Sequence, residues 1–199
     1  MSARPFHHGN LRAVLLERAE LMLREVGIDG ISLRELAREA GVSHGAPRSH
    51  FVDRQALLDA LAERGFDRLT QKVRSVAARG NTFEAQFRDV GHAYVGFAVE
   101  DAALMELMFA AKMNEPPEPV RQAAARLFAT FDELMGARVE AGSGDADSRY
   151  RFGLLFAAAM QGTATLMVAR RISRADGDAL VDDAIDLLLA SKLASQVLR

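Results

Sequence analysis

Apolar residues recur every three or four positions along almost the whole chain, which is the spacing of one face of an α-helix. The first such stripe consists of Leu11, Leu15, Ala19, Met22 and Val26. No segment shows the alternation of β-branched and polar residues that is typical of a strand. The pattern therefore predicts an all-α fold.

Loop-forming segments divide this pattern into separate helices. The sequences ARGNT, NEPPEP, EAGSGDAD and SRADGD are rich in Gly, Pro, Asn and Asp. Around these loops we expect helices over residues 54–79, 82–99, 102–113, 120–141, 146–171 and 178–198. The first of them follows Asp53, a favourable N-cap residue, and its length of roughly 39 Å is enough to join two layers of a protein.

Residues 32–41 begin and end like a short helix. Ser32 and Glu35 have the spacing of a capping box, in which the Ser hydroxyl accepts a hydrogen bond from the Glu amide and the carboxylate reaches back. Gly41 supplies the positive φ that ends such a helix, and Gly27 does the same for the helix before it. Two helices are therefore expected before residue 42.

The next segment, GVSHGAPRSHF, contains two glycines and a proline where a third helix is expected. Ser43 is its predicted N-cap, and Pro47 is tolerated because the first amides of a helix are mostly unpaired. Gly45 and Ala46 carry almost no side chain, which lets the start of the helix approach a groove wall or a phosphate. Together the first helices predict a helix-turn-helix.

The net charge of −2 conceals an uneven distribution of charge. Residues 1–79 carry 13 Lys and Arg against 10 Asp and Glu, whereas residues 80–199 carry 12 against 17. A basic first part indicates an approach to a polyanion, although ordinary scatter explains the same numbers. The arm of residues 1–10 adds Arg4, His7 and His8 and either becomes ordered on DNA or is a solvated terminus.

Composition also limits the chemistry of the chain. The absence of Cys excludes disulfides, thiolate metal sites and Cys nucleophiles. His92 is the one His beyond residue 50, and no nucleophile, base and orienting group form a set, so the rival hypothesis of an all-α enzyme has no support. We expect no enzyme activity, no metal and no cofactor. Without a signal peptide or a long apolar run, a cytoplasmic protein with no membrane partner is expected.

Residues 6–66 resemble the N-terminal domain of the TetR family of bacterial transcriptional repressors. The shared motifs are the capping box at Ser32, the sequence LAREAGVS, and HF followed by DRQALL. From about Gly80 the chain resembles the regulatory domain of that family, and AYVGFAVEDAALMELMF resembles the subgroup with a Trp-His-Gly helix. The resemblance implies a DNA-binding domain over residues 1–55 and an effector-binding and dimerisation domain over residues 56–199.

Two positions depart from the pattern of the family. Met160-Gln161-Gly162 stands where the subgroup has Trp-His-Gly, and Arg48-Ser49 stands where relatives carry Tyr-Arg. In the family that Tyr contacts the DNA backbone. Arg48 would therefore either hold a phosphate or read guanine through O6 and N7. A helical ligand-binding or interaction module that has lost DNA binding is the alternative function.

The resemblance implies DNA contacts from the second, third and fourth helices. The expected contacts are Ser32, Leu33, Arg34, Ser43, His44, Gly45, Ala46, Arg48, Ser49, His50 and Arg54. Arg54 combines a cation with a helix N-terminus, and both attract a phosphate. Ser32 also serves as a cap, a surface role is open for His44 and His50, and Phe51 is expected in the core.

The second part of the chain offers apolar bulk and few polar groups. Six of the eight Met lie there, and such flexible side chains suit a pocket for varied apolar ligands, although core packing explains any one of them. An apolar or aromatic small-molecule effector is expected to contact His92, Tyr94, Phe97, Met105, Met108, Phe109, Phe128, Phe131, Phe156 and Gln161.

The last two helices are expected to pair with those of a second copy in a four-helix interface. The segment LLFAAAMQGTATLM is apolar on more than one face and rich in Ala and Gly, as close helix packing requires. These observations together predict a homodimer that binds a pseudo-palindromic operator in double-stranded DNA and leaves it when an effector binds. Activation in place of repression stays open.

Overall fold

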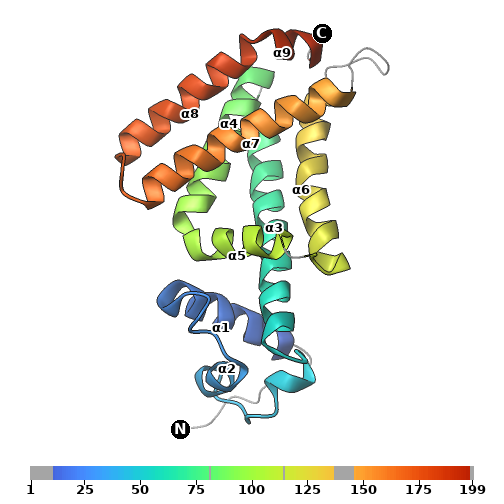
Figure 1. Cartoon of the computed structure of the whole chain (residues 1–199), viewed down its shortest axis with the longest axis vertical. Helices are drawn as coiled ribbons and strands as arrows, with labels where there is room; N and C mark the ends of the chain where they lie inside the picture. Colours follow the sequence, from blue (N-terminus) through green and yellow to red (C-terminus); the bar gives the residue numbers. More distant parts are fainter. Residues whose placement is uncertain (1–10, 81, 114, 137–145, 198–199) are drawn as a thin grey trace. The chain divides into compact units, whose positions relative to one another are not determined.

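The computed structural model describes residues 11–80, 82–113, 115–136 and 146–197, and these residues form helices and no strand. The predicted all-α fold is confirmed. The arm with Arg4, His7 and His8 lies outside the described residues. In chain order the elements are α1 (Leu11–Val26), α2 (Leu33–Glu39), the 3-10 helix η1 (Pro47–Ser49), α3 (Arg54–Ala77), α4 (Phe83–Glu100), α5 (Ala102–Met113), α6 (Glu118–Gly136), α7 (Ala146–Val168), α8 (Arg174–Leu189) and α9 (Lys192–Val197) (Figure 1).

The chain forms two compact units. The first unit comprises Met1–Gly65 and Ala103–Arg121, and the second comprises Phe66–Ala102 and Gln122–Arg199. Helix α3 is one continuous helix that starts in the first unit and ends in the second. The functional division expected at residue 55 stays a prediction, and the packing adds residues 103–121 to the N-terminal helices.

The core of the first unit is built from the apolar faces of α1, α2 and the start of α3. Leu15, Leu36, Phe51, Leu57 and Leu61 are buried there. Helix α5 approaches α3 closely at a glycine: a Cβ on Gly65 would lie 2.6 Å from the sulfur of Met108. The glycine is therefore required by packing, since a larger residue would displace a buried Met.

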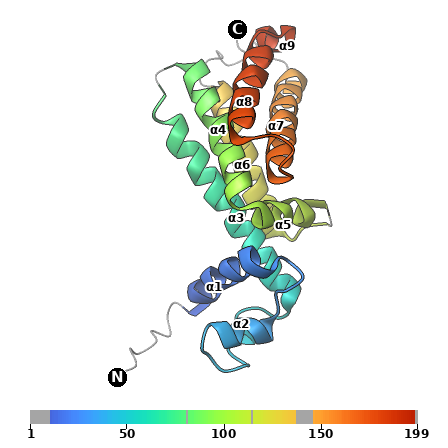
Figure 2. The same ribbon diagram turned by 90° about the vertical axis from the view of Figure 1, so that its left-hand side faces the viewer.

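Helices α4, α7 and α8 pack against one another in the second unit, and α9 covers α7 and α8. Both views show α7 and α8 side by side (Figures 1 and 2). Close contact between α4 and α8 again depends on a glycine, because a Cβ on Gly91 would lie 2.7 Å from Cδ1 of Ile185. An aromatic cluster adds to this core, with ring centroids of Phe87 and Phe156 4.6 Å apart.

Two predicted helices differ from the structure. The expected final helix, residues 178–198, begins earlier and is broken in two. It begins at Arg174 because Ser173 and Asp176 form a reciprocal capping box. It breaks after Leu189 because the hydroxyl of Ser191 accepts a hydrogen bond from the amide of Ala194, at 3.0 Å, and starts α9.

The third helix of the helix-turn-helix is the other difference, since the segment from Ser43 to Phe51 forms 3-10 turns with η1 at their centre. Pro47 has no N–H, so the carbonyl of Ser43 cannot bond to residue 47 and instead accepts the amide of Ala46 at 2.9 Å. The expectation of an α-helix capped by the Ser43 side chain is wrong. Pro47 does not merely fit into an α-helix here, because the segment around it adopts the tighter 3-10 winding.

Candidate functional site

Helix α2 has well-defined ends. At its start the hydroxyl of Ser32 accepts a hydrogen bond from the amide of Glu35 at 3.1 Å, as predicted. The carboxylate of Glu35 accepts the guanidinium of Arg38 instead of reaching back to the cap, and this contact lowers the pKa of Glu35. At its end Gly41 has a φ of 66°. The amides of Gly41 and Val42 bond to Arg38 and Ala37, which completes a Schellman motif.

In the turn from Ser43 to Phe51, some residues are buried in the core and others are exposed. Pro47 and Phe51 are buried, as expected for Phe51, and the guanidinium of Arg12 lies 5.5 Å from the Phe51 ring. Among the predicted contacts, Ala46 is half-buried, and the remaining turn residues are exposed: Ser43, His44, Gly45, Arg48, Ser49 and His50. The structure thus brings these six residues together on the surface of one turn.

Positive charge is available at this surface. Arg34 on α2 and Arg48 in η1 are exposed, and neither pairs with a carboxylate in the part of the chain that the structure describes. Arg38 differs from them because it binds Glu35 and Glu39. A Cβ added at Gly45 would meet no atom within 4 Å. The small residue at position 45 is therefore not demanded by packing within this chain.

Arg54 has a structural task that the sequence did not suggest. Its Nε donates to the carbonyl of Ile31 at 2.9 Å and its Nη2 donates to the carbonyl of Ile28 at 2.6 Å. Asp53 caps the same helix, since its carboxylate accepts the amide of Ala56 at 2.8 Å. Arg54 therefore ties the start of α3 to the loop before α2, and its predicted phosphate contact stays a prediction.

Residue His92 faces helix α8. Its Nε2 lies 2.9 Å from Oδ1 of Asp182, and Arg88 also bonds to Asp182 and Asp186. The hydrogen bonds from His92 and Arg88 lower the pKa of Asp182. This polar network joins α4 to α8, so that a ligand contact by His92 has to compete with Asp182.

The two other predicted polar residues, Tyr94 and Gln161, bond to each other, and Tyr94 is buried whereas Gln161 is half-buried. The hydroxyl of Tyr94 donates to Oε1 of Gln161 at 3.0 Å, and burial raises the pKa of the Tyr94 hydroxyl, which keeps it protonated. Phe97 is buried too, with the guanidinium of Arg68 5.5 Å from its ring. Arg68 also pairs with the buried carboxylate of Asp101 at 2.9 Å. These residues help to hold α4 in place.

Three predicted aromatic residues meet at one cleft. Phe128, Phe131 and Phe156 line a largely apolar cleft of about 120 Å³ between α6 and α7. Sequence reasoning missed the other lining side chains, which include Asp132, Arg149, Tyr150 and Leu154. Small residues at Gly153 and Ala157, on the same helix face as Tyr150, were the available signal.

Three other predicted ligand contacts do not line this cleft. They are Met105, Met108 and Phe109, which belong to the first unit, where Met105 and Met108 are buried and Phe109 is exposed.

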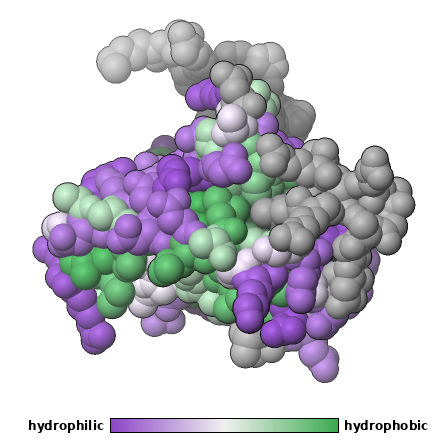
Figure 3. All heavy atoms as spheres, turned by 90° about the horizontal axis from the view of Figure 1, so that it is seen from above, coloured by the Kyte–Doolittle hydropathy of each residue, from purple (hydrophilic) through white to green (hydrophobic). Residues whose placement is uncertain are grey.

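Helices α7 and α8 leave apolar side chains exposed. Leu154 is 44% exposed, Leu155 51%, Leu180 38% and Leu187 74%. By length and composition, the segment Asp147–Val168 of α7 is long and apolar enough to cross a membrane. This finding corrects the expectation that the chain contains no such segment. The core helix of a soluble protein passes the same test. Only 28% of the most apolar 18-residue stretch of this segment is buried. Figure 3, viewed from the end that carries α9, shows hydrophobic residues gathered between hydrophilic ones.

Comparison with known proteins agrees with this architecture. Residues 15–61 match the family model of bacterial regulatory proteins of the tetR family, and residues 87–189 match the tetracyclin repressor-like C-terminal domain. The chain belongs to the TetR family. It is therefore a transcriptional regulator of a family whose members bind DNA operators, act as dimers and are typically not enzymes.

Individual relatives match to different extents. A protein with unknown function from Rhodococcus sp. RHA1 is 38% identical, with a TM-score of 0.84 over 98% of this chain and 100% of that chain. The regulator of fatty acid degradation FadR from Bacillus halodurans shares the fold, with a TM-score of 0.73 and 18% identity over 94% of this chain and 98% of that one. The class A tetracycline repressor of Escherichia coli is 52% identical over 42 residues, which span 21% of this chain and 19% of the repressor.

Proposed function

We propose that this TetR-family regulator is a homodimeric repressor in the bacterial cytoplasm that leaves a pseudo-palindromic operator when an apolar or aromatic small molecule binds. The observation that carries the DNA-binding part is the surface of the turn from Ser43 to Phe51. The turn presents Arg48 and the adjacent helix α2 presents Arg34, and neither forms an ion pair within the part of the chain that the structure describes. Gly45 in the same turn is not required by packing within this chain.

Charge and shape at this surface both favour DNA. Unpaired guanidinium groups release counterions when they neutralise phosphates, which is the main source of affinity for DNA. The absence of a side chain at Gly45 lets a phosphate or a groove wall come close to the turn. For Arg48 we favour the phosphate role, because the residue that it replaces in the family contacts the backbone.

Dimerisation through α7 and α8 is supported by their exposed leucines. A helix as apolar as α7 is stable in water when most of its apolar surface is covered. A second copy of the same pair of helices covers it in a two-fold arrangement, since such an interface uses the same patch on both subunits.

An effector site in the second unit is supported by the cleft at Phe128, Phe131 and Phe156. Its volume of about 120 Å³ is below the range of roughly 300–1,000 Å³ that is typical of ligand pockets. An effector must therefore be small or must widen the cleft by moving α6 and α7. A ligand that prefers the widened form shifts the population of conformations, and repression is released if that form binds the operator less well.

The test starts with selection of binding sites from random DNA by the intact chain. We expect a pseudo-palindrome with half-sites about one helical turn, roughly 34–36 Å, apart. Arg48→Ala should weaken operator and nonspecific DNA about equally, and should lower the slope of log K against log salt by roughly one unit. Arg38→Ala is the matched control, because Arg38 already binds Glu35 and Glu39.

Two results of this experiment would change the proposal. A loss confined to one operator position in Arg48→Ala would assign Arg48 to guanine reading. If no DNA sequence is enriched and binding does not depend on salt, the alternative of a helical ligand-binding or interaction module is favoured. Release from the operator by members of a panel of apolar and aromatic compounds tests the effector part, and activation of transcription in a reporter strain would contradict repression.

A further inference from the structure

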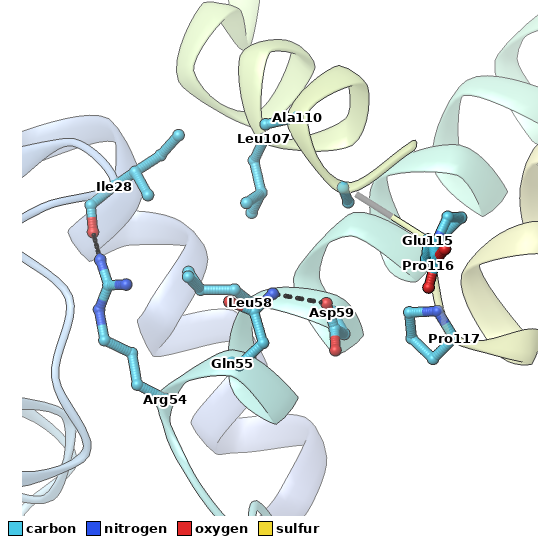
Figure 4. Close-up of a pocket in the computed structure, with 11 residues that line it drawn as sticks. Ile28, Arg54, Gln55, Leu58, Asp59, Leu107, Ala110, Glu115, Pro116 and Pro117 are labelled. Atoms are coloured by element: carbon cyan, nitrogen blue, oxygen red, sulfur yellow. Dashed lines mark hydrogen bonds between the residues drawn. The ribbon is translucent and has the colours of Figure 1, made fainter. Parts of the chain in front are cut away.

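The first unit contains a cavity of its own. About 370 Å³ in volume, it lies between the loop after α1, the start of α3, α5 and residues 115–117. Figure 4 shows Ile28, Leu58 and Leu107 pointing toward it from three elements. Its volume falls within the range of roughly 300–1,000 Å³ found for small-molecule sites. Of the expected DNA contacts, Arg54 lines this cavity, and the effector cleft shares no lining residue with it.

Two carboxylates are among the polar side chains that line the cavity. Asp59 and Glu115 contribute carboxylates, and the amide of Gln55 donates to Oδ1 of Asp59 at 2.8 Å. Among the lining residues that the structure describes, the one cation is Arg54, whose Nε and Nη2 donate to backbone carbonyls. A positive group that enters therefore meets two carboxylates, while the guanidinium is already engaged.

The position of Glu115 gives a second reason to regard the cavity as functional. Its φ of 45° lies in the left-handed region, which is unfavourable for a residue with a side chain. Such strained residues cluster at ligand sites, because the surrounding structure holds them for a purpose other than stability. The strained residue here carries one of the two carboxylates of the cavity.

We propose that this cavity binds a small amphipathic cation, an organic amine with a short hydrocarbon body. The ammonium group lies near Asp59 and Glu115, and the hydrocarbon lies against Ile28, Leu58 and Leu107. This site is separate from the effector cleft of the second unit, and its occupation does not depend on whether the chain is a repressor.

Binding at this site bears on the DNA surface through Arg54. The carbonyls that Arg54 holds belong to Ile28, which lines the cavity, and to Ile31, which precedes the N-cap Ser32. An amine that packs on Ile28 therefore restrains the loop from which α2 starts. The expected consequence is a change in DNA affinity when the amine is present, by the same factor by which DNA changes the affinity for the amine.

Calorimetry on the intact chain with octylamine and octanoate tests the proposal. Octylamine is expected to bind. Octanoate has the same length and the opposite charge, and it is expected to bind at least about tenfold more weakly. Asp59→Asn and Glu115→Gln should each weaken octylamine binding about fivefold, the size of one partly screened charge contact. Ala110→Phe places a ring in the cavity from an exposed position and should abolish binding.

Glu106→Gln is the matched control, since Glu106 is exposed on the same helix, α5, and does not line the cavity. Chemical shifts of the Ile28, Leu58 and Leu107 methyl groups report where the amine binds. Equal binding of octanoate, wild-type binding by Ala110→Phe, or an effect of Glu106→Gln as large as that of Asp59→Asn would each overturn the proposal. If Ala110→Phe does not fold, the two carboxylate variants and the methyl shifts still decide.

Discussion

Truncation of Leu187 provides the sharpest test of the proposed dimer. Leu187 lies on α8 and is 74% exposed in the single chain, the largest exposure among the leucines of α7 and α8 given above. Leu187→Ala removes three methylene equivalents at about 0.8 kcal/mol each when fully buried. Scaled by the exposed fraction, about 1.8 kcal/mol per subunit is available for burial by a partner.

A two-fold interface contains this side chain twice, so that the variant should lose about 3.5 kcal/mol of association free energy, a roughly 300-fold rise in the dimer dissociation constant. Sedimentation equilibrium over nanomolar to micromolar concentrations measures this constant directly. The fold of the single chain should be unaffected to within about 0.5 kcal/mol, because the side chain has few contacts within its own chain.

Val52→Ala is the matched control for this experiment. Val52 is 80% exposed but lies in the first unit, outside α7 and α8, so the dissociation constant should stay within about twofold of the wild-type value. The proposed dimer through α7 and α8 is refuted if Leu187→Ala associates as tightly as the wild type, or if the wild type is monomeric at micromolar concentration. Either result would leave the exposed leucines unexplained by a second copy.

Three further variants test local features of the chain. Gly45→Val should leave the melting temperature nearly unchanged, since a Cβ there meets no atom, yet should weaken operator binding at least about tenfold by keeping DNA from the turn; gel-shift titration against the wild type checks this. The pKa of the Asp182 carboxylate is lowered in the folded chain, so the carboxylate stabilises the fold above pH 3.8, its ordinary pKa, and this effect is lost as the pH falls through the folded pKa. In urea titrations, the free energies of unfolding of the wild type and Asp182→Asn should therefore differ at pH 6 and converge in acid. Arg170 closes α7 with a φ of 54°, and Arg170→Gly should raise the free energy of unfolding by up to about 1 kcal/mol, whereas an unchanged or lower value would show that its side chain has a compensating contact.

Local chemistry made much of this fold predictable. Gly27 and Gly41 ended helices as expected, because a positive φ there is best supplied by glycine. The caps at Ser32 and Asp53 followed from the short reach of their side-chain oxygens to the nearest amides. Arg170 ends α7 in the same way as Gly41 ends α2, but without a glycine the sequence carried no sign of it.

The remaining features depend on contacts that are distant in the sequence. Arg54 bonds to carbonyls at Ile28 and Ile31, far outside the range of helix periodicity, so only its charge was visible in the sequence. The cavity at Asp59 and Glu115 likewise joins α3 to the segment after α5. The 3-10 turn at Pro47 is foreseeable in part, because proline lacks the N–H that an α-helix needs at that position.

The low burial of α7 has a consequence for thermal stability. If a second copy covers this helix, unfolding must first or simultaneously separate the subunits, and the melting temperature then rises with protein concentration. The number of copies in a cell would thus set how much of the regulator is folded as well as how much is bound to DNA. A chain produced at a few molecules per cell would be the most vulnerable to heat and to proteolysis.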